Sequence, residues 1–229
     1  MPTVAARLHA VRGRIAAAAA KGGREPSAVR LVAVAKTASD ADLAAAWAAG
    51  HREFGHNRVQ ALEHAAGVLP EAVWHLIGPL QGNKVRRGLS AAGVIQTVGD
   101  QETAQRLERA AAALDRGTRV PVPVFAQVNF SADDPRDGCR LPALAALLET
   151  LGGLPRLAAQ GLMTLAPAAA DESALRRLFA AVREAAADMA ERGLLPGIPA
   201  LSMGMSGDYE IAVEEGATLV RVGRAIFPA

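Results

Sequence analysis

The sequence is poor in cysteine, lysine and aromatic residues. Of its 229 residues one is Cys and three are Lys, and aromatic residues make up 3%. The single Cys139 cannot form an internal disulfide, so we expect a reducing, cytoplasmic location. No basic segment followed by an apolar run marks a secretory signal peptide at the amino end.

Long apolar runs and an excess of one charge are also missing. The Ala-rich stretch 15–20 is interrupted by Lys21, far short of the ~20 residues that a membrane span needs. The formal net charge is only +2, and no basic stripe indicates a nucleic-acid partner. The five His residues show no metal-ligand spacing, so no metal is expected.

Short β-branched runs alternate with Ala- and Leu-rich stretches of helical period along the whole chain. Eight strands are predicted, at 30–36, 52–54, 73–77, 94–98, 122–128, 157–163, 200–203 and 218–222. Helices are predicted at 40–49, 57–66, 82–92, 101–115, 140–151, 171–192 and 207–215, with an extra helix at 3–21. The pattern favours a single α/β domain over 1–229, a (β/α)8 TIM barrel without a second domain. A doubly wound open sheet is the alternative, because periodicity does not show whether a sheet closes.

Helix starts and loops agree with this division of the chain. Ser39 with Asp42 resembles a capping box, and Asp100 and Asp171 occupy expected N-cap positions. The longest irregular pieces, 131–138 and 167–171, both follow a predicted strand. In a barrel such loops lie at the carboxyl ends of the strands, where binding sites form.

Lysine usage singles out one residue, since the chain uses Arg for nearly all its cations. Lys36 ends the first predicted strand, at the expected barrel mouth. A lysine amine can form a Schiff base with an aldehyde, and desolvation at a strand end would lower its pKa toward the nucleophilic form. An ordinary strand-end lysine reaching solvent is the other interpretation.

Two glycine-containing segments follow the last two predicted strands, 201–208 and 220–225. They contain glycines that allow close backbone approach, together with the hydroxyls of Ser202 and Ser206. Each joins a strand end to a helix start, and the corresponding barrel loops are a common phosphate site. Two ordinary glycine turns remain the alternative. Neither segment matches a nucleophile elbow, and 78–85 lacks the spacing of a P-loop.

A lysine at strand 1 opposite a phosphate site suits a phosphorylated aldehyde, and a set of motifs in order carries a resemblance. The motifs are Leu31-Val-Ala-Val-Ala-Lys36-Thr37, Phe54-Gly-His-Asn-Arg-Val-Gln60, Trp74-His-Leu-Ile-Gly78, Gly161-Leu-Met-Thr164, Ser202-Met-Gly-Met-Ser206 and Arg221-Val-Gly223. The chain resembles the pyridoxal 5'-phosphate (PLP) homeostasis protein family. The resemblance implies the barrel fold of bacterial alanine racemase. It also implies a carrier or regulator of vitamin B6 and amino-acid pools, with no established catalytic turnover.

The resemblance also implies cofactor-binding residues, and no residue receives a catalytic role. It makes Lys36 the lysine of an internal aldimine and places Asn57 near the cofactor. Arg221 would face the pyridine nitrogen and, as a permanent donor, leave it unprotonated, which restrains carbanion chemistry. The phosphate contacts would come from Ser202 or its loop neighbours and from the end of the last strand: Met203, Gly204, Ser206, Gly223 and Arg224.

The sequence departs from the family pattern at several positions. His56 stands where a Glu is usual, Pro79 replaces a His, and Gly82 replaces a Ser. Arg224 replaces a frequent Thr, and the chain ends Phe227-Pro-Ala229 where a Gly commonly follows the Phe. His56 and Pro79 put the contacts at the cofactor rim in question, whereas Arg224 would add charge beside a phosphate.

Two other functions are kept beside the carrier: a fold-related PLP racemase or decarboxylase, and a cofactor-free Schiff-base aldolase. A racemase needs a second acid/base group opposite Lys36, and the only tyrosine, Tyr209, is expected at the phosphate end. We therefore expect no enzymic turnover. Expected partners are PLP, amino acids and, transiently, PLP-dependent apo-enzymes, and the chain is expected to be a monomer.

Overall fold

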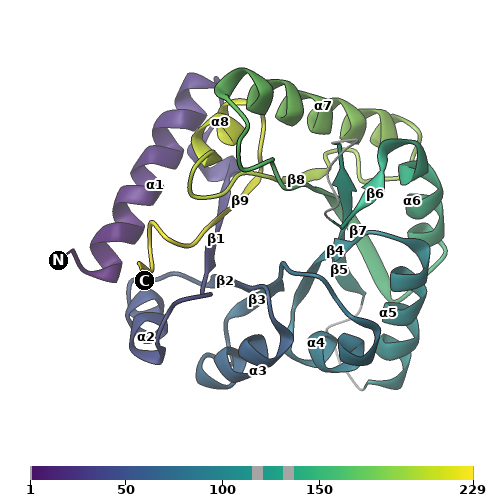
Figure 1. Ribbon diagram of the computed structural model, residues 1–229, viewed down its shortest axis with the longest axis horizontal. Helices are drawn as coiled ribbons and strands as arrows, with labels where there is room; N and C mark the ends of the chain where they lie inside the picture. Colours follow the sequence, from purple (N-terminus) through teal and green to yellow (C-terminus); the bar gives the residue numbers. More distant parts are fainter. Residues whose placement is uncertain (1, 115–120, 131–136, 229) are drawn as a thin grey trace.

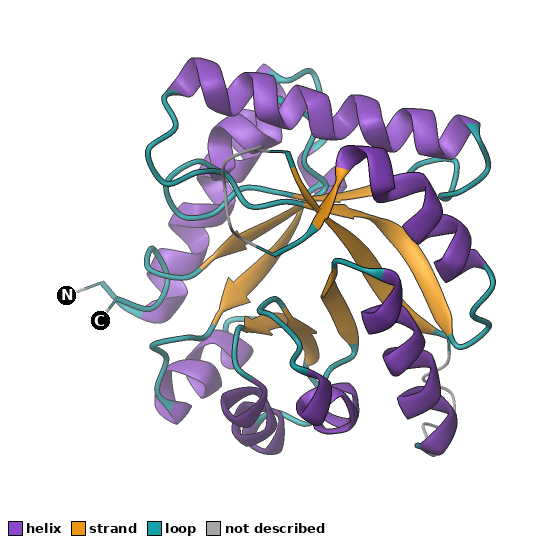
Figure 2. Cartoon of the chain, turned by 45° about the vertical axis from the view of Figure 1, so that its right-hand side comes forward, coloured by secondary structure: helices purple, strands orange, loops and turns teal. Residues whose placement is uncertain are grey.

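The computed structural model describes residues 2–114, 121–130 and 137–228, and within them eight parallel strands close into a barrel surrounded by helices (Figures 1 and 2). The sheet runs in the order β4-β3-β2-β1-β9-β8-β7-β5, and a further pairing of β4 with β5 closes the ring. The prediction of a TIM barrel is therefore confirmed. The alternative of an open sheet is wrong, because an open sheet would leave β4 and β5 as unpaired edges.

The strands agree with the predicted runs to within a few residues at their ends. Their bounds are β1 Arg30–Val34, β2 Glu53–His56, β3 Val73–Leu76, β4 Val94–Val98, β5 Val122–Asn129, β7 Leu157–Met163, β8 Ala200–Ser202 and β9 Leu219–Val222. The two-residue β6, Cys139–Arg140, is not predicted by the sequence pattern; it pairs with the end of β5 outside the ring. A strand this short has no alternating pattern to detect.

The helices form the outer layer. Their bounds are α1 Val4–Lys21, α2 Asp40–Ala48, α3 Val59–Val68, α4 Val85–Ala91, α5 Gln101–Ala113, α6 Leu144–Gly152, α7 Glu172–Glu191 and α8 Tyr209–Glu214, with short 3-10 turns η1 Pro26–Ala28, η2 Gly82–Lys84 and η3 Leu141–Ala143. The predicted extra helix is α1, which packs against α8 and α2 and completes the layer where α8 is short (Figure 1). No helix of the described chain is long and apolar enough to cross a membrane.

The predicted helix starts are confirmed by side-chain caps. Ser39 and Asp42 form a reciprocal capping box at α2. The carboxylates of Asp100 and Asp171 accept the amides of Thr103 and Ala174 at the starts of α5 and α7. Such caps fix where each helix begins and therefore where each strand-to-helix loop ends.

Successive side chains along each strand point alternately outward and inward, which gives the protein two apolar cores. The larger core lies between sheet and helices, and a smaller apolar cluster, Val32, Val94, Phe125, Met163 and Leu219, fills the barrel interior. Side chains two residues further along these strands point to the same side, so Gln96, Arg221 and Val34 also face inward. The interior thus changes from apolar to polar toward the carboxyl ends of the strands.

Candidate functional site

A cavity of about 570 Å³ opens at the carboxyl ends of the strands. Its wall includes Val34, Ile77 and Leu165, which continue the inward-facing side of β1, β3 and β7. Most of the cofactor-binding residues predicted from the sequence also line it, namely Lys36, Asn57, Ser206, Arg221, Gly223 and Arg224. The fold therefore brings together side chains that lie almost 190 residues apart in the chain.

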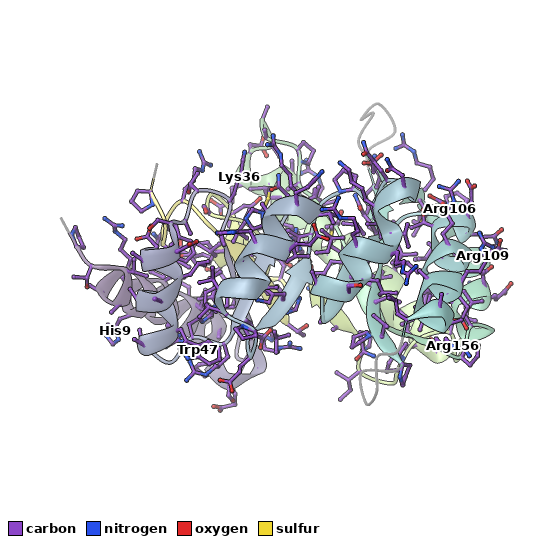
Figure 3. All side chains as sticks on the ribbon, turned by 90° about the horizontal axis from the view of Figure 1, so that it is seen from below. His9, Lys36, Trp47, Arg106, Arg109 and Arg156 are labelled. Carbon is purple, nitrogen blue, oxygen red and sulfur yellow. The ribbon has the colours of Figure 1, made fainter. Side chains whose placement is uncertain are left out.

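Lys36 lies two residues after β1, on the same side of the strand as Val32 and Val34. Figure 3 shows it at the edge of the molecule opposite Trp47 and Arg156. Its amine makes no hydrogen bond or ion pair with any residue of the described chain. The expected desolvation of this amine is not observed, because the Lys36 side chain is exposed. The strand ends at Val34, which leaves Lys36 on the open mouth of the barrel.

Arg221 provides a buried cation in the cavity wall, with only 3% of its surface exposed. Its two terminal nitrogens donate to Ser202 Oγ at 2.5 Å and to the carbonyl oxygen of Thr164 at 2.7 Å. Burial lowers the pKa of Arg221 to about 10, and the nearby Asp208 carboxylate acts in the opposite direction. Arg221 thus remains charged near neutral pH.

The loops after β8 and β9 meet at a hydrogen bond from the Gly223 amide to Ser206 Oγ, at 3.3 Å. Since this hydroxyl oxygen accepts the amide, its own hydrogen remains available to a ligand. Arg224 is exposed beside it and makes no ion pair within the described chain. The helix after the β8 loop is shorter than the predicted 207–215, because α8 has only six residues. Its amino end therefore offers less support to a bound anion than a long helix would.

Asp208 also lines the cavity and was not selected from the sequence. Its carboxylate accepts the amide of Met205 at 2.5 Å, and burial raises the pKa of Asp208. The cavity wall therefore combines three basic side chains, Lys36, Arg221 and Arg224, with one carboxyl group. This balance suits a ligand with a multiply charged anionic group.

Three of the predicted phosphate contacts do not line the cavity. Ser202 and Met203 are fully buried beneath it. Gly204 has a φ of +92°, and a Cβ atom at this position would lie 2.6 Å from the Cβ of Ala212 in α8. Gly204 therefore allows α8 to pack against the loop. A glycine that packs and a glycine that binds look the same in the sequence, so the packing role of Gly204 could not be predicted.

The family departures lie mostly outside the cavity. Pro79 and Gly82 are exposed elsewhere, and His56 is buried beside β1 without lining the cavity. Desolvation lowers the pKa of His56. Among the departures that the structure describes, Arg224 alone reaches the cavity wall.

Tyr209 is 1% exposed and does not line the cavity. Its ring lies 5.5 Å below the guanidinium of Arg14 in α1, and its hydroxyl has no hydrogen-bond partner in the described chain. The tyrosine therefore packs between helices on the outer side of the loop. This position agrees with the expectation that Tyr209 stays away from the reacting end of a bound ligand.

The remaining cavity residues come mainly from the loop after β7, which contributes Ala166, Pro167, Ala168 and Ala170. The predicted position of the irregular piece 167–171 on this face of the barrel is confirmed. The other piece, 131–138, lies mostly outside the described residues. No cluster of metal-ligating side chains occurs among the residues described.

The residues present fit a phosphorylated aromatic aldehyde. A lysine amine without a partner can bind an aldehyde carbon, and a guanidinium and a serine hydroxyl are donors for a ring nitrogen and a phosphate. The side-chain oxygen of Asn57 is buried without a partner and offers an acceptor. A cavity of about 570 Å³ is also large enough for a ligand of this size.

Comparisons with known proteins point the same way. Residues 7–229 match the family described as "Alanine racemase, N-terminal domain". The chain is 40% identical to the pyridoxal phosphate homeostasis protein of Pseudomonas aeruginosa, over 100% of this chain and 96% of that protein. Among solved structures it is similar to PipY of Synechococcus elongatus with PLP bound, with a TM-score of 0.84 and 35% identity over 98% of this chain and 100% of PipY. Alanine racemase of Corynebacterium glutamicum shares the fold, with a TM-score of 0.67 and 17% identity over 97% of this chain and 62% of the racemase.

Proposed function

The chain belongs to the alanine racemase N-terminal domain family, within the group of pyridoxal phosphate homeostasis proteins, and on that premise we propose that it binds PLP at the carboxyl end of its barrel. It acts as a carrier or regulator in vitamin B6 and amino-acid homeostasis. The observation that carries the proposal is the unpartnered Lys36 amine in a cavity that also holds the buried Arg221. One domain over 1–229 contains the whole site.

Lys36 holds the ligand covalently in this proposal. Its amine condenses with an aldehyde with loss of water, and no other residue of the described chain competes for that amine. Because Lys36 is exposed at the mouth of the barrel, the bond stays open to water and to other amines. An accessible bond suits a protein that releases its ligand to free amino acids or to apo-enzymes.

The other residues hold the ligand without a covalent bond. Ser206, Gly223 and Arg224 bind the phosphate, while Arg221 donates to the ring nitrogen and Asn57 accepts near the ring. When bound, PLP supplies an aldehyde and a ring that can withdraw electrons. Arg221 has donors only, so it does not protonate the ring nitrogen, and the ring stays a weak electron acceptor.

We also propose that the protein has no enzymic turnover. The position of Tyr209, buried away from the cavity, supports this proposal, since a racemase needs a second acid/base group facing the lysine. The relatives are named homeostasis proteins. The test is α-proton exchange of L-alanine in deuterated water with the PLP-loaded protein. Exchange near ~10 per second that is lost in Lys36→Ala would mean that the protein is an enzyme.

The binding proposal is tested on the purified protein. Borohydride reduction of the PLP-loaded chain, followed by peptide mass mapping, should place a phosphopyridoxyl group on Lys36. Lys84 serves as the internal control, because it is a lysine that does not line the cavity. A label on Lys84 at the same yield, or no label at all, would contradict the proposal.

Location and assembly complete the proposal. A cytoplasmic, reducing location suits Cys139, which is buried, and burial raises the pKa of its thiol to about 11. We propose the monomer as the binding unit, because the residues assigned to the ligand all line one cavity of a single chain. Light scattering of the PLP-loaded protein should give the mass of one chain, and a mass of two would contradict the monomer.

A further inference from the structure

A row of buried polar side chains crosses the barrel directly beneath the cavity. It consists of Arg221 in β9, Ser202 in β8, Gln96 in β4 and His75 in β3, which we call the interior chain. Each of these residues is 3% exposed or less. The successive distances are 2.5 Å from Arg221 to Ser202 Oγ, 2.6 Å from Ser202 Oγ to Gln96 Oε1 and 2.8 Å from Gln96 Nε2 to His75 Nδ1.

The interior chain joins strands that are not neighbours. In the ring, β4 and β8 are separated by β5 and β7, so the bond between Ser202 and Gln96 spans the inside of the barrel. A buried polar group is costly unless it is paired, and this crossing pairs groups that the backbone ladder cannot reach. The crossing therefore fixes the position of Arg221 relative to the opposite wall.

The direction of each hydrogen bond follows from the chemistry of the groups. Arg221 only donates, so Ser202 Oγ accepts from it, and the single hydroxyl hydrogen of Ser202 goes to Gln96 Oε1. The amide nitrogen of Gln96 then donates to His75 Nδ1. The other ring nitrogen, His75 Nε2, lies 3.3 Å from a carboxylate oxygen of Glu53. Desolvation lowers the pKa of His75, which agrees with a neutral ring that accepts at Nδ1.

This direction leaves Ser202 without a hydrogen for a phosphate. A serine binds phosphate by donating its hydroxyl hydrogen, and that of Ser202 is already given to Gln96. Ser206 differs from Ser202 in two ways. It lines the cavity, and its oxygen accepts the Gly223 amide, so its hydroxyl hydrogen is still available to a ligand. The serine at the end of β8 and the serine in the loop after it therefore have different surroundings.

We infer that Ser202 and Gln96 are positioning residues, which hold the Arg221 guanidinium where it meets the ring of the ligand and make no contact with the phosphate. The inference rests on the proposed function, because Arg221 needs a ring to face. It also divides recognition between β8 and the loop that follows it: the buried strand end, at Ser202, serves the ring end, and the loop, at Ser206, serves the phosphate end.

The experiment compares two aldehydes that differ only in the phosphate, PLP and pyridoxal. Binding of each to full-length Ser202→Ala, Gln96→Met and Ser206→Ala is measured by the visible absorbance of the bound aldehyde. We expect Ser202→Ala and Gln96→Met to weaken both aldehydes by the same factor, ~3–10-fold, and to shift the absorption maximum. Ser206→Ala should weaken PLP alone and leave the spectrum of bound pyridoxal unchanged.

Two further variants separate positioning from general damage to the barrel. Ser202→Thr keeps the hydroxyl that accepts from Arg221 and donates to Gln96, so binding of both aldehydes should return close to that of the unaltered protein. In an Arg221→Met background, Gln96→Met should cause no further loss, because the cation that it positions is gone. Additive losses in the double variant would overturn the inference in favour of a structural role.

The remaining outcomes are equally decisive. If Ser202→Ala weakens PLP but not pyridoxal, Ser202 is a phosphate contact and the inference is wrong while the proposed function stands. If neither aldehyde responds to Ser202→Ala, the inference is also wrong. If the unaltered protein binds neither aldehyde, the proposed function fails, and the inference fails with it.

Discussion

The two ends of the barrel treat polar side chains differently. At the amino end of the strands Arg30 binds the carboxylate of Glu53 with two hydrogen bonds of 2.9 and 2.6 Å. His51 lies at the same end, between Arg12 and the carbonyl oxygen of Glu53. At the carboxyl end Lys36 and Arg224 have no partner in the described chain, and the buried side-chain oxygen of Asn57 lies next to the His56 ring without a regular hydrogen bond.

This contrast separates stability from binding. A polar group that is paired within the protein contributes to the folded state, and removing one partner leaves the other unpaired. A polar group without a partner does not stabilise the folded state, and one that is also buried destabilises it, but such a group stays available to a ligand. We therefore expect changes at the amino end to alter the free energy of unfolding, and changes at the carboxyl end to alter affinity for PLP.

The largest effect is expected from Lys36→Ala, which should abolish covalent binding of PLP. Because Lys36 has no partner in the described chain, the free energy of unfolding should change by no more than ~0.5 kcal/mol. Borohydride trapping gives the first quantity and urea unfolding of the ligand-free protein gives the second. Lys84→Ala is the matched control and should leave trapping intact.

A loss of several kcal/mol in Lys36→Ala without ligand would break the contrast. It would mean that the site contributes to folding as the amino end does. Trapping that survives in Lys36→Ala would instead place the covalent bond on another residue.

At the amino end, Glu53 should make stability depend on acid pH. Desolvation raises the pKa of Glu53, but the His75 ring 3.3 Å away and the two hydrogen bonds from Arg30 outweigh it and lower this pKa from 4.5 to about 2. The folded state binds this proton more weakly than the unfolded state does, so the stabilisation is full above pH 4.5 and is lost as pH falls toward 2. The shift corresponds to at most ~3 kcal/mol, and Glu53→Gln should remove this part of the pH dependence of unfolding.

The control for this prediction is Glu102→Gln on the exposed surface of α5, where the carboxylate is 70% exposed. Its unfolding free energy should follow that of the unaltered protein over the same pH range. Equal slopes for Glu53→Gln and the unaltered protein below pH 4.5 would show that the paired amino end adds no pH-dependent stability.

The fold could be read largely from the sequence, because strand and helix periods record local burial. All eight barrel strands were located, and the capping box at Ser39 and Asp42 marked α2 correctly. Closure of the sheet into a barrel could not be predicted from the sequence, since it depends on the pairing of β4 with β5. The short β6 was missed because it pairs with the end of β5 and has no period of its own.

The candidate site divides in the same way. Lys36 is singled out by its rarity and strand position and Arg221 by the family resemblance, and both line the cavity. Ser202 and Ser206 looked alike in sequence, and only the fold shows that one is buried against Gln96 and the other lines the cavity. Asp208 was not predicted as a cavity residue, because a carboxylate is not expected beside a phosphate.

The third prediction concerns Arg224→Glu, which places a negative charge beside the phosphate. We expect affinity for PLP to fall by ~1–3 kcal/mol, or roughly 5–150-fold, because a charged hydrogen bond is replaced by repulsion. Unfolding of the ligand-free protein should hardly change. Arg109→Glu, a charge reversal on α5 far from Lys36 (Figure 3), is the control and should bind PLP as the unaltered protein does.

Pyridoxal sharpens this prediction, since it has no phosphate to be repelled. Its affinity should be nearly the same for Arg224→Glu and the unaltered protein. If PLP binding is unchanged in Arg224→Glu, the phosphate lies elsewhere. The unpaired Arg224 at the carboxyl end would then have a role other than binding this ligand.

The smallest effect is expected from Asn57→Ala, which removes the buried oxygen that has no partner in the described chain. Affinity for PLP should fall by ~0.5–1.5 kcal/mol, the net value of one hydrogen bond. Unfolding of the ligand-free protein should become no easier, because an unpaired buried polar atom costs free energy in the folded state. Calorimetric titration with PLP and urea unfolding measure the two effects.

Asn83→Ala is the matched control, since Asn83 is an exposed asparagine outside the cavity wall. It should change neither quantity. The informative case is a variant Asn57→Ala that loses stability and keeps its affinity for PLP. That result would place Asn57 with the paired groups of the amino end, and absence of a partner would then no longer distinguish the binding end of this barrel from the end that stabilises it.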